Sequence, residues 1–258
     1  MSLGENAASF LRRISGKPPK TAAVILAGGS GTRMGGGEKA KQWLPILGEP
    51  VIVHTIRAFE ECDVIEELVL VSRREDMKEL VSLVKAHRFR KVKRVVAGGE
   101  NRQESARLGL EAIGDDMQYI AIHDACRCLI TPDMIEKVVK EAHLLKAACA
   151  GTPVTDTIKH VGHAAFVKET PPREEYWAAQ TPQVFRTSLY RCAAYSAKRY
   201  GWVGTDDASL VERAGQTVRM VDCGRENIKI TYLCDLAVAE AILLERRAKK
   251  NETKEDER

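Results

Sequence analysis

The stretch AAVILAGGSGTRMGGGEKAKQWLP, residues 22–45, decides how the rest of the chain is interpreted. It begins with an apolar run, residues 22–26, that is short enough for a strand buried on both faces. The run ends in a loop of small residues, 27–33, that carries a single arginine, Arg33. Glycines let backbone N–H groups approach a phosphate closely, and Arg33 with a following lysine would neutralise its charge. The stretch therefore predicts a triphosphate-binding loop after the first strand.

Two common phosphate-binding patterns do not match this loop. A P-loop requires Gly-x-x-x-x-Gly-Lys-Ser/Thr, and a dinucleotide fingerprint requires Gly-x-Gly-x-x-Gly at the start of a helix. The second mismatch disfavours a dinucleotide-dependent oxidoreductase. A glycine-rich turn by itself is also typical of any tight connection between a strand and a helix. The residues that follow it, among them Lys39, Lys41 and Gln42, favour the triphosphate-binding interpretation.

The composition bounds the class of protein. The chain has 258 residues, of which 44% are hydrophobic and 29% charged, as in ordinary soluble globular proteins. Its net charge of +4 is spread without a basic stripe and interleaved aromatics, so we expect no nucleic-acid partner. The seven cysteines include no Cys-x-x-Cys pair, which argues against a zinc site or a disulfide framework. Without a membrane-spanning run or a signal-peptide pattern, we expect a cytoplasmic protein with no membrane partner.

Strand-like and helix-like segments alternate along the chain. This order predicts an α/β fold with a mostly parallel twisted sheet and helices on both faces. The predicted strands are residues 22–26, 67–72, 92–97, 119–123, 147–154, 183–186 and 217–222. The predicted helices are residues 51–61, 74–87, 101–112, 132–145, 187–200, 206–214 and 234–247. We expect one domain over residues 21–248, preceded by a leader, 1–20, and followed by a charged tail, 249–258.

Residues 155–177 break the alternation. The segment is polar and strand-like, with Gly162 at the expected turn and little apolar surface to bury against the main sheet. It predicts a protruding β-hairpin, or β-arm. Protrusions of this kind often serve dimerisation or a neighbouring active site. From the pattern alone, a plain surface hairpin is equally consistent.

Asp124 follows the apolar run 119–122 and is expected near the carboxyl end of a strand. In open α/β sheets this edge is where ligands bind. A carboxylate beside a triphosphate loop is a natural ligand for Mg²⁺, although Asp124 alone could equally cap the next turn. The neighbouring His123 is expected to be a packed core residue.

Three further polar junctions carry candidate functions. At residues 98–105, GGENRQES, the glycines would admit a planar base and Ser105 would read base edges, while Asn101 caps a helix in a capping box with Glu104. At residues 205–208, TDDA, the simple interpretation is a helix cap. Further on, Asn227 and Lys229 are two residues apart and would face the same side of a strand.

A set of stretches together resembles one family. They are LAGGSGTRM, KQWLP, AGGENRQES, HDACR, VTDTIK, WAAQTPQVF, TDDASLVE and ENIKIT, in order over residues 21–245. The chain is similar to the 2-C-methyl-D-erythritol 4-phosphate cytidylyltransferases of the non-mevalonate isoprenoid pathway, the IspD family. The first stretch is shared with many sugar nucleotidyltransferases and indicates only that class. The later stretches, such as DTIK, QTPQ and NIKIT, are more specific.

The resemblance implies a fold, an assembly and a reaction. The fold would be the Rossmann-like nucleotidyltransferase fold, and the assembly a homodimer whose β-arm reaches into the partner's site. The reaction would join 2-C-methyl-D-erythritol 4-phosphate (MEP) to CTP with Mg²⁺. Its products would be 4-diphosphocytidyl-2-C-methyl-D-erythritol and pyrophosphate.

The resemblance also implies roles for single residues. Arg33 and Lys41 would stabilise charge at the α-phosphate and the leaving group, the main device available in nucleotidyl transfer. Arg173 and Lys229 would position the MEP phosphate for in-line attack. The CTP site would consist of Ala27, Gly28, Gly29, Gly99, Glu100 and Ser105. The methylerythritol pocket would consist of Asp124, Arg127, Thr157 and Thr181.

The chain departs from the family pattern at three places. The family's HDAARP is HDACRC here, so residue 128 is a cysteine instead of a proline that would stiffen the loop. The spacing between Arg33 and Lys41 is one residue longer than expected, so the choice of Lys41 over Lys39 depends on the following Gln42. Glu100 stands where the family often has Asp.

Two other functions remain open from the sequence. The first is a cytidylyltransferase for ribitol 5-phosphate or another polyol phosphate, because a few pocket residues decide between such substrates. The second, from a different class, is a non-catalytic nucleotide-binding domain. The presence of Arg33, Lys41, Asp124 and Lys229 argues against the second.

Overall fold

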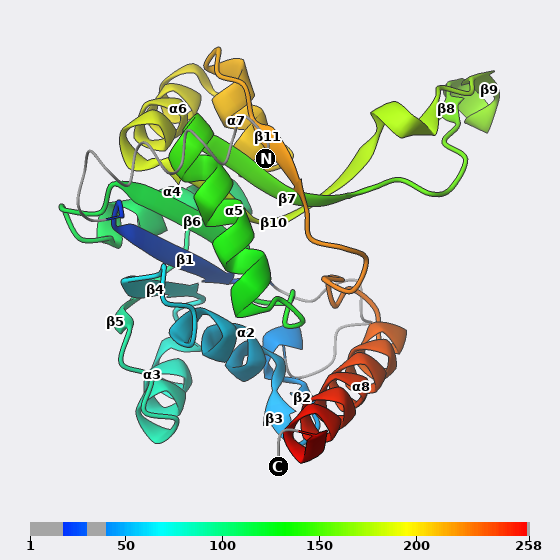
Figure 1. Cartoon of the computed structure of the whole chain (residues 1–258). Helices are drawn as coiled ribbons and strands as arrows, with labels where there is room; N and C mark the ends of the chain where they lie inside the picture. Colours follow the sequence, from blue (N-terminus) through cyan, green and yellow to red (C-terminus); the bar gives the residue numbers. More distant parts are fainter. Residues whose placement is uncertain (1–17, 30–39, 257–258) are drawn as a thin grey trace.

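A seven-stranded sheet forms the centre of the chain in the computed structural model, which describes residues 18–29 and 40–256 (Figure 1). The strand order is β11-β7-β10-β6-β1-β4-β5. Among the described strands of this sheet, only β10 runs antiparallel to its neighbours. This confirms the predicted α/β class and the mostly parallel sheet. The strands are β1 (Thr21–Ala27), β4 (Glu67–Ser72), β5 (Val92–Ala97), β6 (Tyr119–Asp124), β7 (Ala147–Pro153), β10 (Trp177–Arg186) and β11 (Arg219–Asp222).

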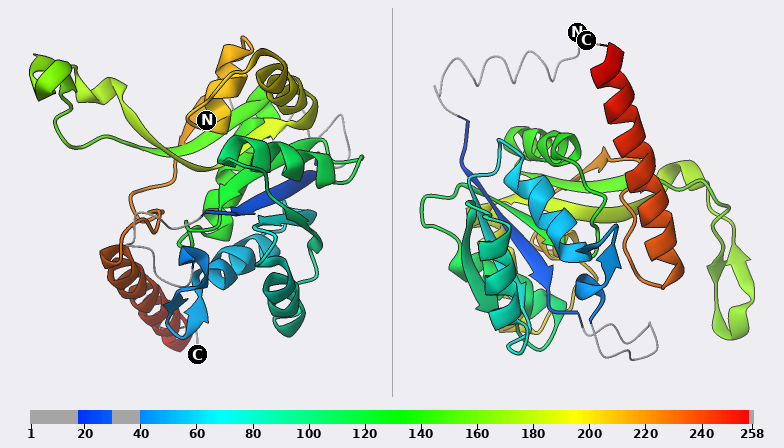
Figure 2. Two further views of the ribbon diagram at one scale, coloured as in Figure 1. Left: turned by 180° about the vertical axis from the view of Figure 1, so that it is seen from behind. Right: turned by 90° about the horizontal axis from the view of Figure 1, so that it is seen from below.

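Helices cover both faces of the sheet, as the two further views show (Figure 2). They are α2 (Val51–Glu60), α3 (Met77–Ala86), α4 (Arg102–Ala112), α5 (Pro132–Leu145), α6 (Thr187–Tyr200), α7 (Asp207–Arg213) and α8 (Cys234–Asp256). Alternate residues of β1 point to opposite faces. Ala23 and Ile25 therefore join a core with α2, α3 and α5, while Val24 and Leu26 join a core with α4, α6 and α7.

A third, smaller apolar cluster lies beside the sheet and includes the C-terminal helix. α8 packs there against the small hairpin of β2 (Pro45–Ile46) and β3 (Glu49–Pro50) and against the loop after β6. Arg246 on α8 donates a hydrogen bond to the Leu129 carbonyl at 2.8 Å and pairs with Glu226 at 2.8 Å. The helix thus fixes two loops that carry candidate site residues. It extends to Asp256, through most of the segment that we expected to be a charged tail.

Helix starts agree with the caps expected from the sequence. Thr131 accepts a hydrogen bond from the Met134 N–H at 3.3 Å and begins α5, which has the predicted bounds. Asp206 begins α7 in a capping box with Ser209, which confirms the helix cap expected at residues 205–208. Among the described residues, no helix is both long enough and apolar enough to cross a bilayer.

The structure differs from the sequence analysis at one predicted strand and at one segment that was considered as a strand. β10 begins at Trp177 instead of residue 183, because the polar QTPQ sequence stays within the strand, at a register shift between Ala179 and Gln183. The strand expected across Asn227 and Lys229 does not form, and residues 223–231 are irregular. A strand pattern without a neighbouring strand cannot form a ladder, and here the buried Asn227 side chain supplies the hydrogen bonds to β10 instead.

The β-arm projects away from the sheet in every view (Figures 1 and 2). Its hairpin consists of β8 (His160–Val161) and β9 (Val167–Glu169), and the Gly162 N–H donates to the Phe166 carbonyl across the turn at 2.9 Å. This confirms the predicted hairpin with Gly162 at the turn. Phe166 is 76% exposed and Val167 57% exposed, so the arm presents apolar side chains to solvent.

Gly109 lies on the side of α4 that packs against Val24 of β1. A Cβ at residue 109 would lie 2.3 Å from Val24 Cγ1 in the buried core. Gly→Ala in an unhindered helix stabilises by about 0.5–1 kcal/mol, so we expect Gly109→Ala to reverse this sign and lower the free energy of unfolding by about 1–3 kcal/mol. Urea unfolding followed by circular dichroism measures the change. Added to Val24→Ala, which removes the obstructing methyl groups, Gly109→Ala should cost much less, and an equal cost would contradict the steric explanation.

Candidate active site

The candidate site lies at the topological switch point of the sheet, where the order of successive strands reverses. From β1 the chain adds β4 and β5 on one side and then β6 on the other. The carboxyl ends of β1 and β6 therefore form the crevice in which open α/β sheets bind ligands. Leu26 is in register with Asp124, so the glycine-rich loop and the acidic end of β6 begin side by side.

Gln42 fixes the start of the glycine-rich loop through a hydrogen bond to its backbone. Its buried side chain donates to the Ala27 carbonyl at 2.8 Å and to Asp76 at 3.4 Å. Among the residues that the structure describes, no atom lies within 4 Å of the Cβ positions of Gly28 and Gly29. From the sequence, Gln42 served only to support the triphosphate-binding interpretation and the choice of Lys41, and this buried contact with the loop was not predicted.

Lys41 contacts the segment that carries Lys229. Its ammonium donates to the Thr231 carbonyl at 2.9 Å, and Thr231 is two residues after Lys229. Two of the predicted catalytic cations thus come from distant parts of the sequence to one region. Arg33 and Lys39 lie outside the described residues, so the choice between Lys39 and Lys41 stays a prediction.

The loop after β5 is fixed by side chains of α4. Ser105 accepts a hydrogen bond from the Gly99 N–H at 3.1 Å and donates to the Asn101 carbonyl at 2.9 Å. Asn101 caps α4 as predicted, but Glu104 accepts from the Glu100 N–H instead of completing the box on Asn101. The three predicted CTP-binding residues of this loop therefore lie together, with the Ser105 hydroxyl shaping the loop from within.

Asp124, at the end of β6, makes two ion pairs. Its two oxygens accept from Arg102 Nε at 3.0 Å and from Lys229 Nζ at 2.6 Å. Burial alone would raise the pKa of the Asp124 carboxyl, but the charges of Arg102 and Lys229 outweigh it and hold that pKa well below its ordinary range. The structure thus brings Asp124 and Lys229 into direct contact.

Thr181 ties β10 to the end of β6. Its Oγ1 accepts from the Asp124 N–H at 3.0 Å and lies 3.0 Å from His123 Nδ1. Because His123 Nε2 lies 3.2 Å from the Arg127 carbonyl, which can only accept, the imidazole carries its proton on Nε2 and the Thr181 hydroxyl donates to Nδ1. Burial lowers the pKa of His123 to about 3, so this ring stays neutral and serves the core, as the sequence predicted.

Arg127 links three segments at the rim of the site. Its guanidinium donates to the Asn227 carbonyl at 2.8 Å and to the Ala179 carbonyl at 3.4 Å. Asn227 in turn donates its amide to Gln180 Oε1 at 2.9 Å. Arg127 Nε and Asn227 Oδ1 are buried without a partner among the described residues. The role of Arg127 in a substrate pocket stays a prediction, and the sequence did not reveal the buried role of Asn227.

The loop that lacks the family's proline is held by packing. Cys128 is buried in the cluster with α8, and the Ile230 N–H donates to the Cys126 carbonyl at 2.8 Å. Burial raises the pKa of the Cys126 thiol to about 11, so this side chain is a neutral thiol at neutral pH and not a nucleophile.

Two predicted site residues are not brought to Asp124 within the chain. Thr157 and Arg173 lie on the exposed β-arm, where the Arg173 guanidinium donates to the Thr155 carbonyl at 2.9 Å. The arm projects away from the sheet (Figure 1). A site that uses them would therefore need an arm from another copy of the chain.

The described residues do not form a resident metal site. They contain no group of three or more His, Cys, Asp or Glu side chains suited to a metal ion. Both oxygens of Asp124 are engaged by cations, so a metal ion there would have to displace Lys229 or Arg102. The role of Asp124 as a metal ligand stays a prediction that this arrangement does not favour.

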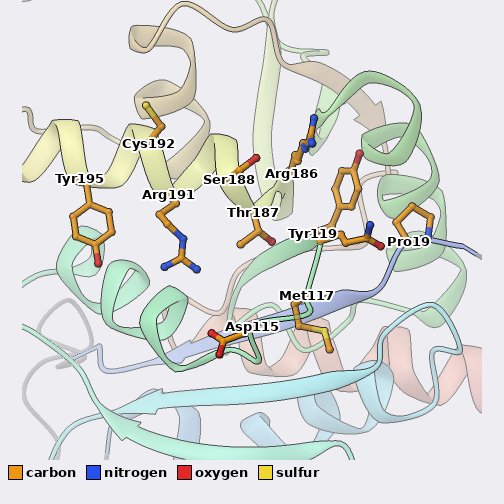
Figure 3. A pocket seen from close by; sticks show the side chains of 11 residues that line it. Pro19, Asp115, Met117, Tyr119, Arg186, Thr187, Ser188, Arg191, Cys192 and Tyr195 are labelled. Atoms are coloured by element: carbon orange, nitrogen blue, oxygen red, sulfur yellow. The ribbon is translucent and has the colours of Figure 1, made fainter.

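A pocket of about 720 Å³ lies at the opposite edge of the sheet (Figure 3). It is lined by residues at the amino ends of β6 and α6, among them Tyr119, Arg186 and Arg191. None of the predicted site residues lines it. The candidate site is therefore distinct from this cavity.

A glycine-rich loop and converging basic side chains at the switch point of a mostly parallel sheet define the class of nucleotidyltransferases with a Rossmann-like fold. The family model described as 2-C-methyl-D-erythritol 4-phosphate cytidylyltransferase, IspD, matches residues 21–245. The chain belongs to the IspD family.

Individual relatives agree with this assignment. A 2-C-methyl-D-erythritol 4-phosphate cytidylyltransferase of Symbiobacterium thermophilum is 44% identical over 222 residues, 86% of this chain and 92% of the relative. One of Synechococcus is 40% identical over 223 residues, 86% of this chain and 97% of the relative. The crystal structure of 4-diphosphocytidyl-2C-methyl-D-erythritol synthase from Anaerococcus prevotii superposes with a TM-score of 0.79 at 26% identity, covering 88% of this chain and all of that one.

Proposed function

We propose that this chain is a 2-C-methyl-D-erythritol 4-phosphate cytidylyltransferase of the non-mevalonate isoprenoid pathway, which converts MEP and CTP to 4-diphosphocytidyl-2-C-methyl-D-erythritol and pyrophosphate. The observation that carries this proposal for the site is the convergence of Lys41, Lys229 and Asp124 at the carboxyl edge of β1 and β6. Family membership supports the choice of substrates.

The reaction needs no covalent enzyme intermediate. An oxygen of the MEP phosphate attacks the α-phosphorus of CTP and forms a new P–O bond, while the bond from that phosphorus to the bridging oxygen breaks and pyrophosphate leaves. Lys41, with Arg33, stabilises the negative charge that develops on the α-phosphate and leaving group. Lys229 leaves Asp124 to hold the MEP phosphate in line with that bond. The backbone at Gly28, Gly29 and Gly99 accommodates the nucleotide.

CTP enters this scheme with Mg²⁺ as its counter-ion. The described residues offer no carboxylate cluster for the ion. Mg²⁺ would therefore be expected to bind mainly through the oxygens of the substrate triphosphate. When bound, it would supply charge neutralisation of the leaving pyrophosphate, beside the positive charge that Lys41 supplies.

The assembly that we propose is a homodimer in the cytoplasm. Each β-arm would cross to the partner and bring Thr157 and Arg173 to the site from which they are separated in one chain. The arm exposes Phe166, Val161 and Val167 to solvent. Clustered apolar side chains in water are unfavourable and typically mark an interaction surface, which supports this proposal.

Turnover with a panel of acceptors tests the proposed substrate. We expect pyrophosphate release from CTP with MEP, and rates lower by about tenfold or more with ribitol 5-phosphate or erythritol 4-phosphate, because unpaired polar groups in the pocket cost transition-state binding. The assay is run with Mg²⁺ and with excess EDTA, which should abolish turnover. Preference for ribitol 5-phosphate over MEP would favour the alternative polyol phosphate. Nucleotide binding without turnover of any acceptor would favour a non-catalytic domain.

A further inference from the structure

On the interior side of Asp124, a series of hydrogen-bonded side chains has no role in the proposed reaction. Arg102, the first residue of α4, bridges two carboxylates, with Nε at 3.0 Å from Asp124 and Nη1 at 2.7 Å from Asp207. The Tyr190 hydroxyl donates to the other oxygen of Asp207 at 2.6 Å. Together with Lys229, these side chains form a continuous path from the rim of the site to the interior of the fold.

The path is buried at one end and exposed at the other. The Asp207 side chain is 1% exposed and Tyr190 is fully buried, stacked on Phe185, whereas the Lys229 side chain is 44% exposed. Arg102 lies between them with its side chain 32% exposed. The interior end is therefore fixed by packing, and Lys229 is the member that is free to move.

We propose that Arg102 is a positioning residue that allows Lys229 to leave Asp124 for the substrate phosphate. When Lys229 moves, Asp124 loses one of its two cations, and a buried carboxylate without a counter-ion is strongly unfavourable. Arg102 remains on the other oxygen, always charged and itself held in place by Asp207. Asp124 thus stays compensated and in place through the exchange. This inference rests on the proposed role of Lys229 in binding phosphate.

The same helix offers a matched control. Arg107 of α4 is also largely buried and pairs with carboxylates, Glu104 and Glu111, but it has no contact with Asp124 or Asp207. Arg107→Gln removes one charge and two ion pairs from the same element, although its partners Glu104 and Glu111 are 38% and 36% exposed. A general loss of helix stability would appear in both variants, whereas an effect through Lys229 would appear only with Arg102.

The experiment measures steady-state kinetics and thermal unfolding of Arg102→Gln, Arg102→Lys and Arg107→Gln with MEP and CTP. We expect Arg102→Gln to lower kcat/KM for MEP by about 10- to 100-fold, while the Kd of CTP changes less than about threefold. Arg107→Gln should keep nearly wild-type kinetics. Arg102→Lys, which keeps a cation beside Asp124, should recover part of the loss and guards against an unfolded glutamine variant.

A double-mutant cycle with Lys229→Gln separates positioning from structure. If Arg102 acts through Lys229, Arg102→Gln should cost less than about twofold once Lys229 is already gone. Additive effects in the cycle, or an Arg102→Gln variant that behaves like Arg107→Gln, would overturn the inference. Wild-type protein without turnover of MEP would instead overturn the proposed function, so the two failures are distinguishable.

Discussion

Lys229→Ala is expected to lower kcat with MEP and CTP by about 10²- to 10³-fold, the range seen when one preorganised donor to a developing charge is removed. In the free protein the Lys229 ammonium lies 2.6 Å from Asp124, with a side chain 44% exposed, so it can reach either the carboxylate or a phosphate at the rim. Alanine leaves neither a cation for the phosphate nor a donor to fix its oxygens. Pyrophosphate release under saturating CTP measures the effect, with MEP varied to separate kcat from KM.

A surface lysine with the same kind of contact provides the control. Lys140 on α5 pairs with Glu136 at 2.6 Å and its side chain is 51% exposed, close to the exposure of Lys229. Lys140→Ala should leave turnover unchanged. Arg102 still compensates Asp124 in Lys229→Ala, so that variant should unfold at nearly the wild-type temperature. Near-normal rates for Lys229→Ala would remove this lysine from the site.

The parts of the site that could be predicted are those that depend on short stretches of sequence. Asp124 was placed at the end of a buried strand because an apolar run followed by a carboxylate marks the carboxyl edge of a parallel sheet. The cap at Asn101 was predicted for the same reason, since its bond to Glu104 spans three residues. The helices and strands were predicted from the local periodicity of apolar residues and from helix caps. The main errors were the start of β10 and the end of α8.

The parts that could not be predicted depend on contacts between distant residues. Arg102 was in view within GGENRQES, yet its partner Asp207 is 105 positions away and is identified only once α4 and α7 pack on one face. Asn227 and Lys229 were expected to share a strand face. Their segment is instead shaped by side-chain bonds to β10 and β6, which no period in the sequence encodes. The polar composition of these two stretches indicated that they have a function, but it did not indicate which residues they contact.

The β-arm makes the second large prediction, which concerns a mixture of two inactive proteins. Arg173→Ala and Lys41→Ala are each expected to lower turnover by about 10²-fold or more, because each removes a cation from the reacting phosphates. In a dimer whose arms cross, one site of the mixed dimer would combine the intact Lys41 of the first variant with the intact Arg173 of the second. The other site would lack both. Co-expression with two different tags and tandem purification isolates this mixed dimer.

The mixed dimer should have about half of the wild-type rate per dimer, because one of its two sites is complete. A pair of changes on the same body, Lys41→Ala with Lys229→Ala, gives the matched control, since every site then lacks one cation whichever way the arms run. Arg173 lies on the exposed arm and Lys41 at the carboxyl edge of the sheet, so the two are far apart within one chain. Recovered activity would therefore require that they come from different chains. If the mixed dimer is no more active than either single variant, Arg173 acts in the site of its own chain or in no site at all. Failure to recover any doubly tagged protein would contradict the homodimer itself.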